Sequence, residues 1–283
     1  MNQTAFVLLL SEVPGVGDAT LGSILRGNAV FRRTPEEFLS LNSDQIVTEY
    51  KIRKSVADKM TRFTPEIKSA AIASALSLSR ANVELVTLLD ATYPQRLLDV
   101  MSEPPSALYL YGNRSILDVA TFAVANSNGA PESALAAGDE CAEKAIAAGE
   151  TLVTGHNRIQ YQRPALVAKR EGGRTCYILD RGILEAFDGD LSKGLFPAAR
   201  IWSPDFDSYR DLAISMFAPR DHSIATHNRK RDEVIFALAD TIYSVWLSPG
   251  GQMERRCREM REQGKTILPV NMETSISAPE AKI

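Results

Sequence analysis

The chain has 283 residues, 45% of them hydrophobic, enough to bury one large core or a large core with a small domain. Its formal net charge of −3 excludes a bulk polycation that coats nucleic acid, while a local basic patch stays compatible with it. The cysteines Cys141, Cys176 and Cys257 lie far apart with no CxxC spacing, so we expect reduced thiols in a cytoplasmic protein. The apolar runs are too short to cross a membrane, and we expect no membrane partner.

The first 82 residues read as a small all-helical domain. In TPEEFLSL, Thr34 is a predicted N-cap and Pro35 occupies the first helical position. Thr64 and Pro65 repeat this device before an Ala- and Leu-rich helix that is predicted to end near Asn82.

A helix-hairpin-helix pattern stands at the start of this domain, in SEVPGVGDATLGSILR. In that motif a tight turn, here at Gly15 and Gly17, presents backbone N–H groups to a DNA phosphate at a helix N-terminus. The alternative is a turn used only for packing or partner contact, and Asp18 beside it would oppose a phosphate.

From residue 83 onward, short β-branched runs alternate with helical patterns. The runs that read as strands are 83–89, 107–112, 121–126, 150–155, 174–179, 241–247 and 265–270. The helical patterns are 132–148, 162–170, 231–239 and 252–263. This alternation implies βαβ crossovers, so the predicted fold class is α/β: a Rossmann-like, mainly parallel sheet flanked by helices, after a helix-hairpin-helix (SAM-like) domain. We expect domains at 1–82 and 83–271 and a flexible tail at 272–283.

Catalytic and metal-binding patterns are missing from the sequence. His156, His222 and His227 have no partner at metal-ligand spacing, and neither a G-x-S-x-G elbow, a Walker A loop nor HExxH occurs. The sequence therefore predicts a protein that is not an enzyme and needs no cofactor.

Two segments offer phosphate-binding chemistry. FAVANSNGAP (122–131) is a strand that ends in a small-residue turn, but it has no basic residue, so we interpret it as a relic of a phosphate loop kept for the fold. The basic run Arg229–Arg231 lies with Arg220 at a predicted loop and helix start, where guanidinium groups suit phosphate. The alternative is a solvated helix start, because acidic residues at 221, 232 and 233 dilute the charge.

The spacing of DATYPQRLLDVMSEPPSALYLYGN (90–113) is specific. Its YP-x-x-L, Pro-Pro-x-x-L-Y and Gly-Asn resemble the DprA/Smf family, the DNA-processing protein A group, which has these motifs just before a Rossmann-like domain. The segments TGHNRIQYQRPALVAKREGGRTCYIL and THNRKRDEVIFALADTIYSVWLSPGGQ continue the resemblance at the family's spacing. It covers roughly residues 5–270.

The chain departs from the family pattern around its central pocket. Asn126-Ser127-Asn128 stands where the family has Gly-Ser-Arg, so the phosphate-binding arginine of that loop is missing. Tyr161 stands at the family's Asp and Ala165 at its His. We therefore interpret the chain as a divergent member with a rewritten pocket.

Residues that match the family's loops, together with the basic run and the hairpin turn, make up the candidate DNA- or phosphate-binding set. The set is Arg229, Asn228, His227, Lys230, Arg231, Arg220, Thr154, Gly155, Arg158, Gly250, Gly251, Gly15 and Gly17.

Three functions stay open from the sequence. The resemblance implies a homodimer that binds single-stranded DNA and acts with RecA in DNA processing and recombination. The first alternative is an antitoxin or regulatory subunit of a toxin–antitoxin pair in phage defence, acting through a protein partner. The second is a nucleotide-sensing Rossmann module, in which Ser127 and the Thr154-Gly155 turn donate to a phosphate.

Overall fold

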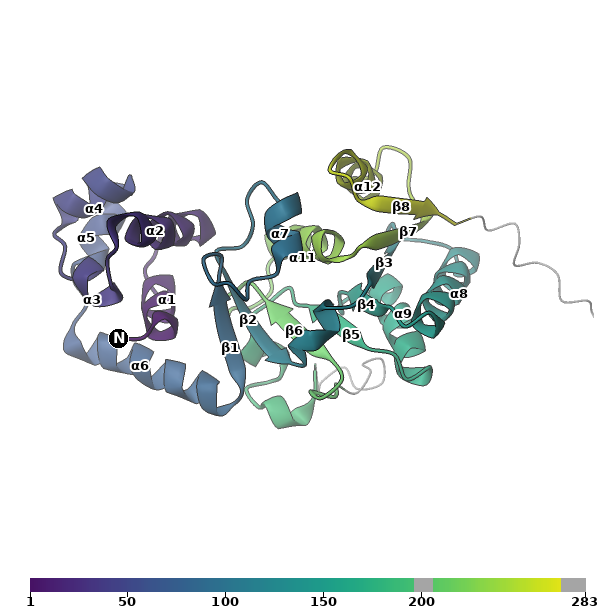
Figure 1. The fold of residues 1–283 in the computed structure, drawn as a ribbon, viewed down its shortest axis with the longest axis horizontal. Helices are drawn as coiled ribbons and strands as arrows, with labels where there is room; N and C mark the ends of the chain where they lie inside the picture. The colour runs from purple at the N-terminus through teal and green to yellow at the C-terminus, as the bar shows by residue number, and fades with distance from the viewer. Residues whose placement is uncertain (196–205, 271–283) are drawn as a thin grey trace, which may run out of the picture. The chain divides into compact units, whose positions relative to one another are not determined.

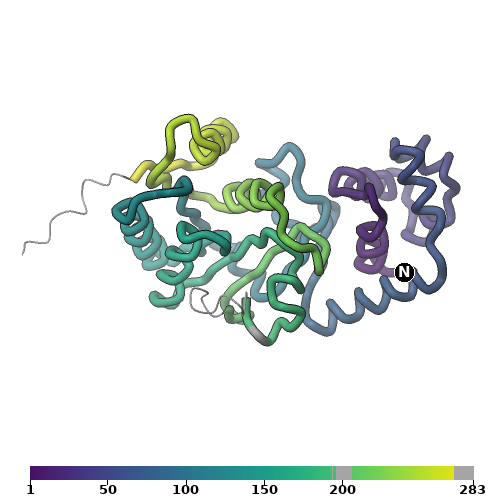
Figure 2. The backbone as a smooth tube through the Cα atoms, turned by 180° about the vertical axis from the view of Figure 1, so that it is seen from behind, coloured from purple at the N-terminus to yellow at the C-terminus, as the bar shows by residue number. Residues whose placement is uncertain are grey.

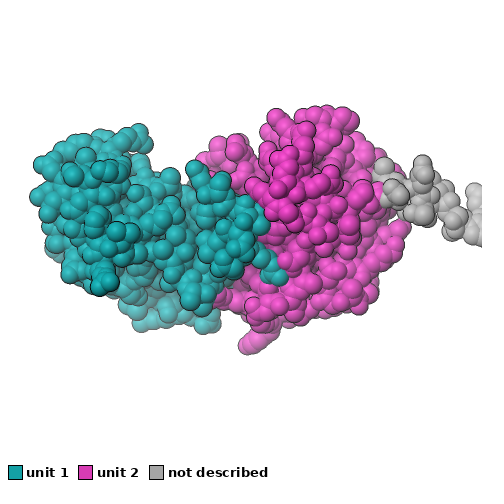
Figure 3. Space-filling view, turned by 45° about the horizontal axis from the view of Figure 1, so that its top comes forward, with its two compact units in different colours: residues 1–111, 181–185, 214–222 teal, residues 112–180, 186–213, 223–283 magenta. Residues whose placement is uncertain are grey.

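The computed structural model describes residues 1–195 and 206–270. The chain forms two compact units: unit 1 comprises residues 1–111, 181–185 and 214–222, and unit 2 the remainder (Figure 3). The predicted division after residue 82 follows the change from helices to strands, not the boundary between these units, and it stays a prediction. The predicted flexible tail lies outside the described residues.

Unit 1 is a helical assembly followed by an antiparallel strand pair (Figure 1). Its helices are α1 (Gln3–Ser11), α2 (Asp18–Phe31), α3 (Pro35–Phe38), α4 (Ser43–Tyr50), α5 (Lys54–Met60), α6 (Pro65–Arg80) and α7 (Gln95–Val100). The strands β1 (Val83–Thr87) and β2 (Ala107–Gly112) pair antiparallel, with Val83 opposite Tyr111.

The helix starts of unit 1 follow the sequence rules closely. The side chains of Asn2, Thr34, Asn42 and Thr64 each accept a hydrogen bond from a first-turn backbone N–H. Thr34 and Glu37 complete a capping box, which confirms the predicted N-cap. Four of these helices therefore satisfy one of their free N–H groups internally.

Tyr50, at the end of α4, packs within the hydrophobic core of unit 1. Its ring packs edge-on against Phe38, with centroids 5.0 Å apart, and its hydroxyl donates to Asn28 Oδ1 at 2.7 Å. A Cβ at Gly27 would lie 2.5 Å from the Tyr50 ring, so only glycine lets α2 approach this closely. Packing thus explains a glycine in the middle of a helix, where propensity disfavours it.

The predicted hairpin turn lies between α1 and α2. Gly15 has φ +101°, a conformation that favours glycine, and a Cβ there would meet Val56 at 2.9 Å. Asp18 does not face an open turn, because its Oδ1 accepts the backbone N–H of Ser106 at 2.8 Å. The Ser106 hydroxyl in turn donates to the Asp18 carbonyl, so the start of α2 is anchored to the chain just before β2.

We expect Asp18→Ala to lower the free energy of unfolding by about 1–3 kcal/mol, because the Ser106 N–H loses its acceptor. Urea denaturation followed by circular dichroism measures this loss. Asp44→Ala is the matched control, since the Asp44 side chain is 87% exposed and forms a surface ion pair with Lys54. Its cost should stay below about 1 kcal/mol, and equal costs for the two variants would contradict the anchoring role of Asp18.

Unit 2 is built on parallel strands. These are β3 (Thr121–Asn126), β4 (Thr151–Thr154), β5 (Thr175–Ile178), β7 (Thr241–Trp246) and β8 (Thr266–Pro269), hydrogen-bonded in the order β5-β4-β3-β7-β8. With β6 (Leu212–Ser215) they belong to a mixed, mostly parallel sheet of order β1-β2-β6-β5-β4-β3-β7-β8. The predicted α/β fold class is confirmed.

The helices of unit 2 connect these strands by crossovers. They are α8 (Glu132–Ala147), α9 (Ile159–Arg170), α11 (Ala225–Leu238) and α12 (Gln252–Glu262). Unit 2 also contains the short elements η1 (Arg114–Leu117) and η2 (Leu191–Lys193), while α10 (Ile183–Ala186) lies mostly in unit 1. α8 packs against α9, and α11 packs against α12. From β3 the chain runs outward through β4 and β5 and later returns to β7 on the other side of β3, a path that can be followed in Figure 2. The direction of winding therefore reverses between β3 and β7.

Two element predictions were wrong. β6 was missed, because its four buried residues give no periodicity that separates a strand from loop or helix. α11 was predicted to start at Arg231, whereas it begins at Ala225. Its first two turns are polar and lack a capping side chain, so the sequence there resembles a loop.

Candidate functional site

The carboxyl ends of the unit 2 strands form the edge where ligands of such sheets bind, above all where the winding reverses. Helices α8, α9, α11 and α12 begin after strands of this sheet, and none of their N-caps makes a side-chain hydrogen bond. Free backbone N–H groups and the helix dipole favour an anion at such ends. Unit 1 differs, since four of its helices are capped by side chains.

Arg231, on α11, lies inside this edge with only 1% of its surface exposed. Its Nε and Nη2 donate to Asp232 Oδ1 at 3.0 and 2.7 Å, and its Nη1 donates to Asn228 Oδ1 at 2.9 Å and to Asn157 Oδ1. The guanidinium carbon lies 4.7 Å from the centre of the Tyr161 ring. The N–H groups of the Arg231 guanidinium therefore form hydrogen bonds within the protein.

The bonds around Arg231 join three loops. Asn157, after β4, also donates from Nδ2 to Asp180 Oδ2 at 2.8 Å and to Asn228 Oδ1 at 2.9 Å. Asp180, after β5, accepts the Ser223 hydroxyl at 2.9 Å just before α11 begins. The start of α11 is thereby fixed to the loops that follow β4 and β5.

The protonation states of this cluster are set by burial and by neighbouring charges. Burial opposes the charge on Arg231, but Asp232 and Tyr161 outweigh it and raise the pKa of Arg231 above its ordinary value. Burial, with help from Asp232, raises the pKa of Tyr161. The guanidinium thus stays charged and the phenol stays neutral around neutral pH.

Gly155 leaves the space that Arg231 fills. A Cβ at Gly155 would lie 3.1 Å from the Tyr161 ring and 3.2 Å from both Cδ and Nε of Arg231. We expect Gly155→Ala to cost about 1–3 kcal/mol, because neither neighbour can move without breaking the bonds above. Thermal unfolding measures this cost, and an unchanged midpoint would show that the cluster yields.

Arg229 and Arg231 should behave oppositely on substitution. Arg231→Ala should lower the free energy of unfolding by about 3–5 kcal/mol, since it leaves buried acceptors unpaired. Arg229→Ala should change it by less than about 0.5 kcal/mol, because that side chain is 79% exposed and, among the described residues, forms its ion pair with Glu233 alone. Chemical denaturation of both variants decides it, and a mild effect of Arg231→Ala would refute the structural role.

A second guanidinium reaches the turn after β3. Arg158, the N-cap of α9, donates from Nη1 to Asn128 Oδ1, and Gln160 Nε2 donates to the same oxygen at 2.8 Å. Arg158 is half-buried and Asn128 is exposed. A positive charge from the loop after β4 therefore lies on the loop after β3, ahead of α8.

The remainder of the basic run faces outward. Arg229 and Lys230 are exposed, and the Nε of Arg229 donates to Glu233 at 3.0 Å. His227 Nδ1 lies 3.0 Å from the carbonyl oxygen of Asp180. Arg229 and Lys230 are thus accessible cations on the first two turns of α11.

The glycine turn after β7 already holds an anion. Gly250 has φ +69°, and its N–H donates to Glu254 Oε2 at 2.7 Å. The turn is tied to the loop after β3, because Ser248 N–H donates to Ser127 Oγ at 2.9 Å, while Gly251 N–H donates to the Ser248 carbonyl. Thr154 is used internally as well, since its hydroxyl donates to the Tyr161 carbonyl at 3.3 Å.

The candidate set from the sequence leaves out two asparagine side chains at this edge. Asn126 ends β3 where the winding reverses, is 2% exposed, and within the described part of the chain its Oδ1 has no hydrogen-bond partner. The other is Asn157, whose side chain joins three elements. The usable signal for Asn126 was a polar residue at the end of an otherwise apolar strand.

The candidate residues fall into both units. Arg220, Gly15 and Gly17 belong to unit 1, and all the others belong to unit 2. The roles assigned to them from the sequence stay predictions.

Metal and thiol chemistry find no support in the described ranges. Residues 1–195 and 206–270 hold no group of three or more His, Cys, Asp or Glu side chains arranged to bind a metal ion. Burial raises the pKa of the Cys257 thiol to about 11, which makes it a poor nucleophile. Among the helices described, none is long and apolar enough to cross a membrane.

Comparisons with known proteins show the fold. No protein-family model matches the sequence, and no curated protein matches it significantly. DNA processing protein A from Streptococcus pneumoniae aligns over 95% of this chain and 87% of its own, with 17% identity and a TM-score of 0.66. The chain therefore has a DprA-like fold and is a divergent example of it.

Two further solved structures are more distant. DNA processing protein A from Helicobacter pylori, studied for its mode of binding single-stranded DNA, aligns over 66% of this chain and 80% of its own, with 16% identity and a TM-score of 0.48. The molybdenum cofactor carrier protein from Chlamydomonas reinhardtii aligns over 53% of this chain and 75% of its own, with 14% identity and a TM-score of 0.34.

Proposed function

We propose that this protein binds single-stranded DNA through its phosphates, at the carboxyl edge of the unit 2 sheet. The observation that carries the proposal is the placement of Arg158 on Asn128. The sequence resemblance puts a phosphate-binding arginine at position 128, and the chain has Asn there. Arg158 supplies a guanidinium at the same loop from a neighbouring element.

The surroundings of Arg158 suit a phosphate. It stands at the uncapped start of α9, close to the loop that leads into α8, so free N–H groups and a cation converge. Arg229 and Lys230 add exposed positive charge on α11, whose first turn contains no acidic residue. Arg231 acts differently, since it positions these elements and does not reach solvent.

This chemistry reads the backbone and not the bases. Guanidinium, ammonium and N–H groups bind phosphate oxygens, which are the same for every sequence. Binding should therefore be indifferent to sequence and should weaken as salt rises. The net charge of −3 does not oppose this, because a phosphate responds to the cations next to it more than to the total charge of the chain.

Arg158→Ala should weaken binding to a labelled poly-dT oligonucleotide about fivefold or more, since one charge-assisted contact is lost. The slope of log affinity against log salt should shrink by about 0.7, the value for one phosphate contact to a single strand. Fluorescence anisotropy at several salt concentrations measures both quantities.

Arg170→Ala is the matched control for this test. Arg170 lies at the far end of the same helix and pairs with Glu143 and Glu171, so the substitution changes the net charge equally without touching the site. Equal losses for the two variants would reduce the effect to bulk charge. Absence of binding by the unaltered protein at low salt would overturn the proposal.

The finer roles implied by the resemblance are tested separately. Homodimer formation is measured by sedimentation, and assistance to RecA by the rate at which RecA filaments form on coated single strands. A toxin partner is tested by co-expression with the product of the neighbouring gene. A nucleotide-sensing role predicts that a mononucleotide competes with poly-dT at the Arg158 site, whereas backbone binding predicts weak competition. Because we propose that the protein is not an enzyme, we expect the DNA to remain unchanged in all of these assays.

A further inference from the structure

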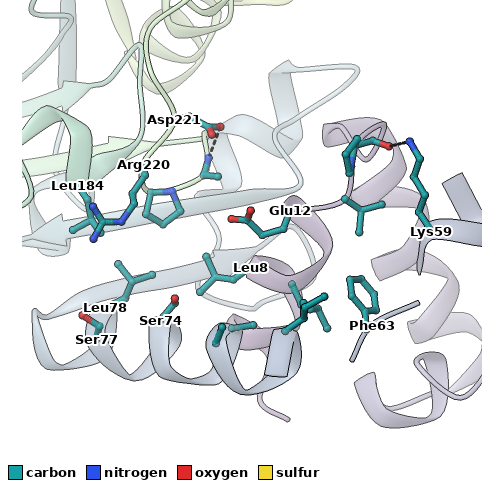
Figure 4. A pocket seen from close by; sticks show the side chains of 18 of the residues that line it. Leu8, Glu12, Lys59, Phe63, Ser74, Ser77, Leu78, Leu184, Arg220 and Asp221 are labelled. Atoms are coloured by element: carbon teal, nitrogen blue, oxygen red, sulfur yellow. Dashed lines mark hydrogen bonds between the residues drawn. The ribbon is translucent and has the colours of Figure 1, made fainter. Parts of the chain in front are cut away.

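Unit 1 holds a groove that the DNA-binding edge of unit 2 does not use. It has a volume of about 730 Å³ and lies between α1 and α6, within the range of roughly 300–1,000 Å³ typical of small-molecule sites (Figure 4). Residues 218–221 and Leu184 close one side, and the N–H of Leu184 fixes that side by donating to the Pro219 carbonyl at 2.8 Å. We call it the α1–α6 groove.

The walls of the α1–α6 groove are mostly apolar. Leu8 of α1 and Val13, which follows α1, line it, and Phe63 and Leu78 lie toward the two ends of the groove. The α6 residues that line it recur on one face from Ile67 to Leu78, which at 1.5 Å per residue makes a wall roughly 16 Å long. An apolar wall that extends along three turns of a helix fits an extended alkyl chain, which can contact its whole length.

One end of the groove offers a positive charge. Arg220, Ser77 and Leu184 lie at that end in Figure 4, and Phe63 and Lys59 lie at the other. Within the described part of the chain Arg220 has no ion-pair or hydrogen-bond partner, and it is exposed.

The other charged side chains that line the groove either interact with other groups of the protein or limit the negative charge that a ligand can carry. Lys59 Nζ donates to the Pro14 carbonyl at 3.0 Å, and the charge of Arg62 acts on Asp58. Asp221 accepts the N–H of Ala218 at 3.0 Å. Glu12 points into the groove (Figure 4), so a second negative charge on the ligand would be repelled and a polyanion such as DNA is excluded there.

We propose that the α1–α6 groove binds a soluble, single-chain amphiphile, with its alkyl chain along α6 and one anionic end group at Arg220. The apolar wall buries the chain and contributes most of the affinity. The pairing with Arg220 at an exposed end sets the orientation and contributes less.

Dodecanoate, kept below its micellar concentration, is the probe, and isothermal titration calorimetry of the full chain measures its binding. Ser74→Trp should weaken binding at least about tenfold, because the indole fills the space needed by the alkyl chain. Ser74 is exposed and lines the groove, so this variant is expected to fold. Ala73→Trp is the matched control, since Ala73 is exposed on the same helix but does not line the groove.

The charge of the ligand is tested by two further arms. Arg220→Ala should weaken dodecanoate binding about two- to fivefold, the loss expected for one exposed ion pair. Dodecylamine should bind more weakly than dodecanoate, whereas equal or tighter binding of the amine would show that Glu12 selects the ligand and would overturn the anionic assignment.

Three other results would overturn the proposal as a whole. The first is that the unaltered protein does not bind dodecanoate, and the second is that the Ser74→Trp and Ala73→Trp variants bind it equally. The third is that the protein binds phosphatidylglycerol vesicles but does not bind monomeric dodecanoate. Binding of poly-dT by Ser74→Trp should stay unchanged, which separates this site from the DNA-binding edge.

Discussion

The geometry at the carboxyl edge of the unit 2 sheet depends on the hydrogen bonds of the buried Arg231 guanidinium. A charge at 1% exposure is tolerated only when it is paired, and here Asp232, Asn157 and Asn228 supply the acceptors. These partners come from the loop after β4 and from α11 itself. The hydrogen bonds that the buried charge requires therefore hold this loop and this helix together. Because successive helical residues turn by about 100°, an inward Arg231 leaves Arg229 and Lys230 pointing outward.

A parallel sheet also explains why uncapped helix starts gather in one place. Every crossover helix that follows a parallel strand must start at the carboxyl edge, so free N–H groups accumulate there by topology. Unit 1 satisfies most of its helix starts with side chains, whereas unit 2 leaves its long helices uncapped. Where unit 2 does fill such a position, at Gly250, the partner is the Glu254 carboxylate.

The sequence predicted local structure well and tertiary relations poorly. Thr34 and Thr64 act as N-caps as expected, because capping depends on residues three positions apart. β6 and the start of α11 were mispredicted, since burial and long-range bonds decide them. The pairing of Arg158 with Asn128 joins residues 30 positions apart and could not be read from either loop alone. The bond from Ser106 to Asp18 joins residues 88 positions apart and could not be predicted from the hairpin pattern.

The proposed role of Arg158 in place of the family's arginine at position 128 has a physical basis. A phosphate responds to the position of the positive charge and the N–H groups, not to the segment that carries them. The loops after β3 and β4 are adjacent because their strands pair directly, so a guanidinium from either can occupy the same space. A chain can then lose the arginine of one loop and keep its charge at the edge, provided the backbone is held. In this protein the bonds of Arg231 and Asn157 hold the loop after β4 to α11, and the proposed phosphate site depends on that arrangement.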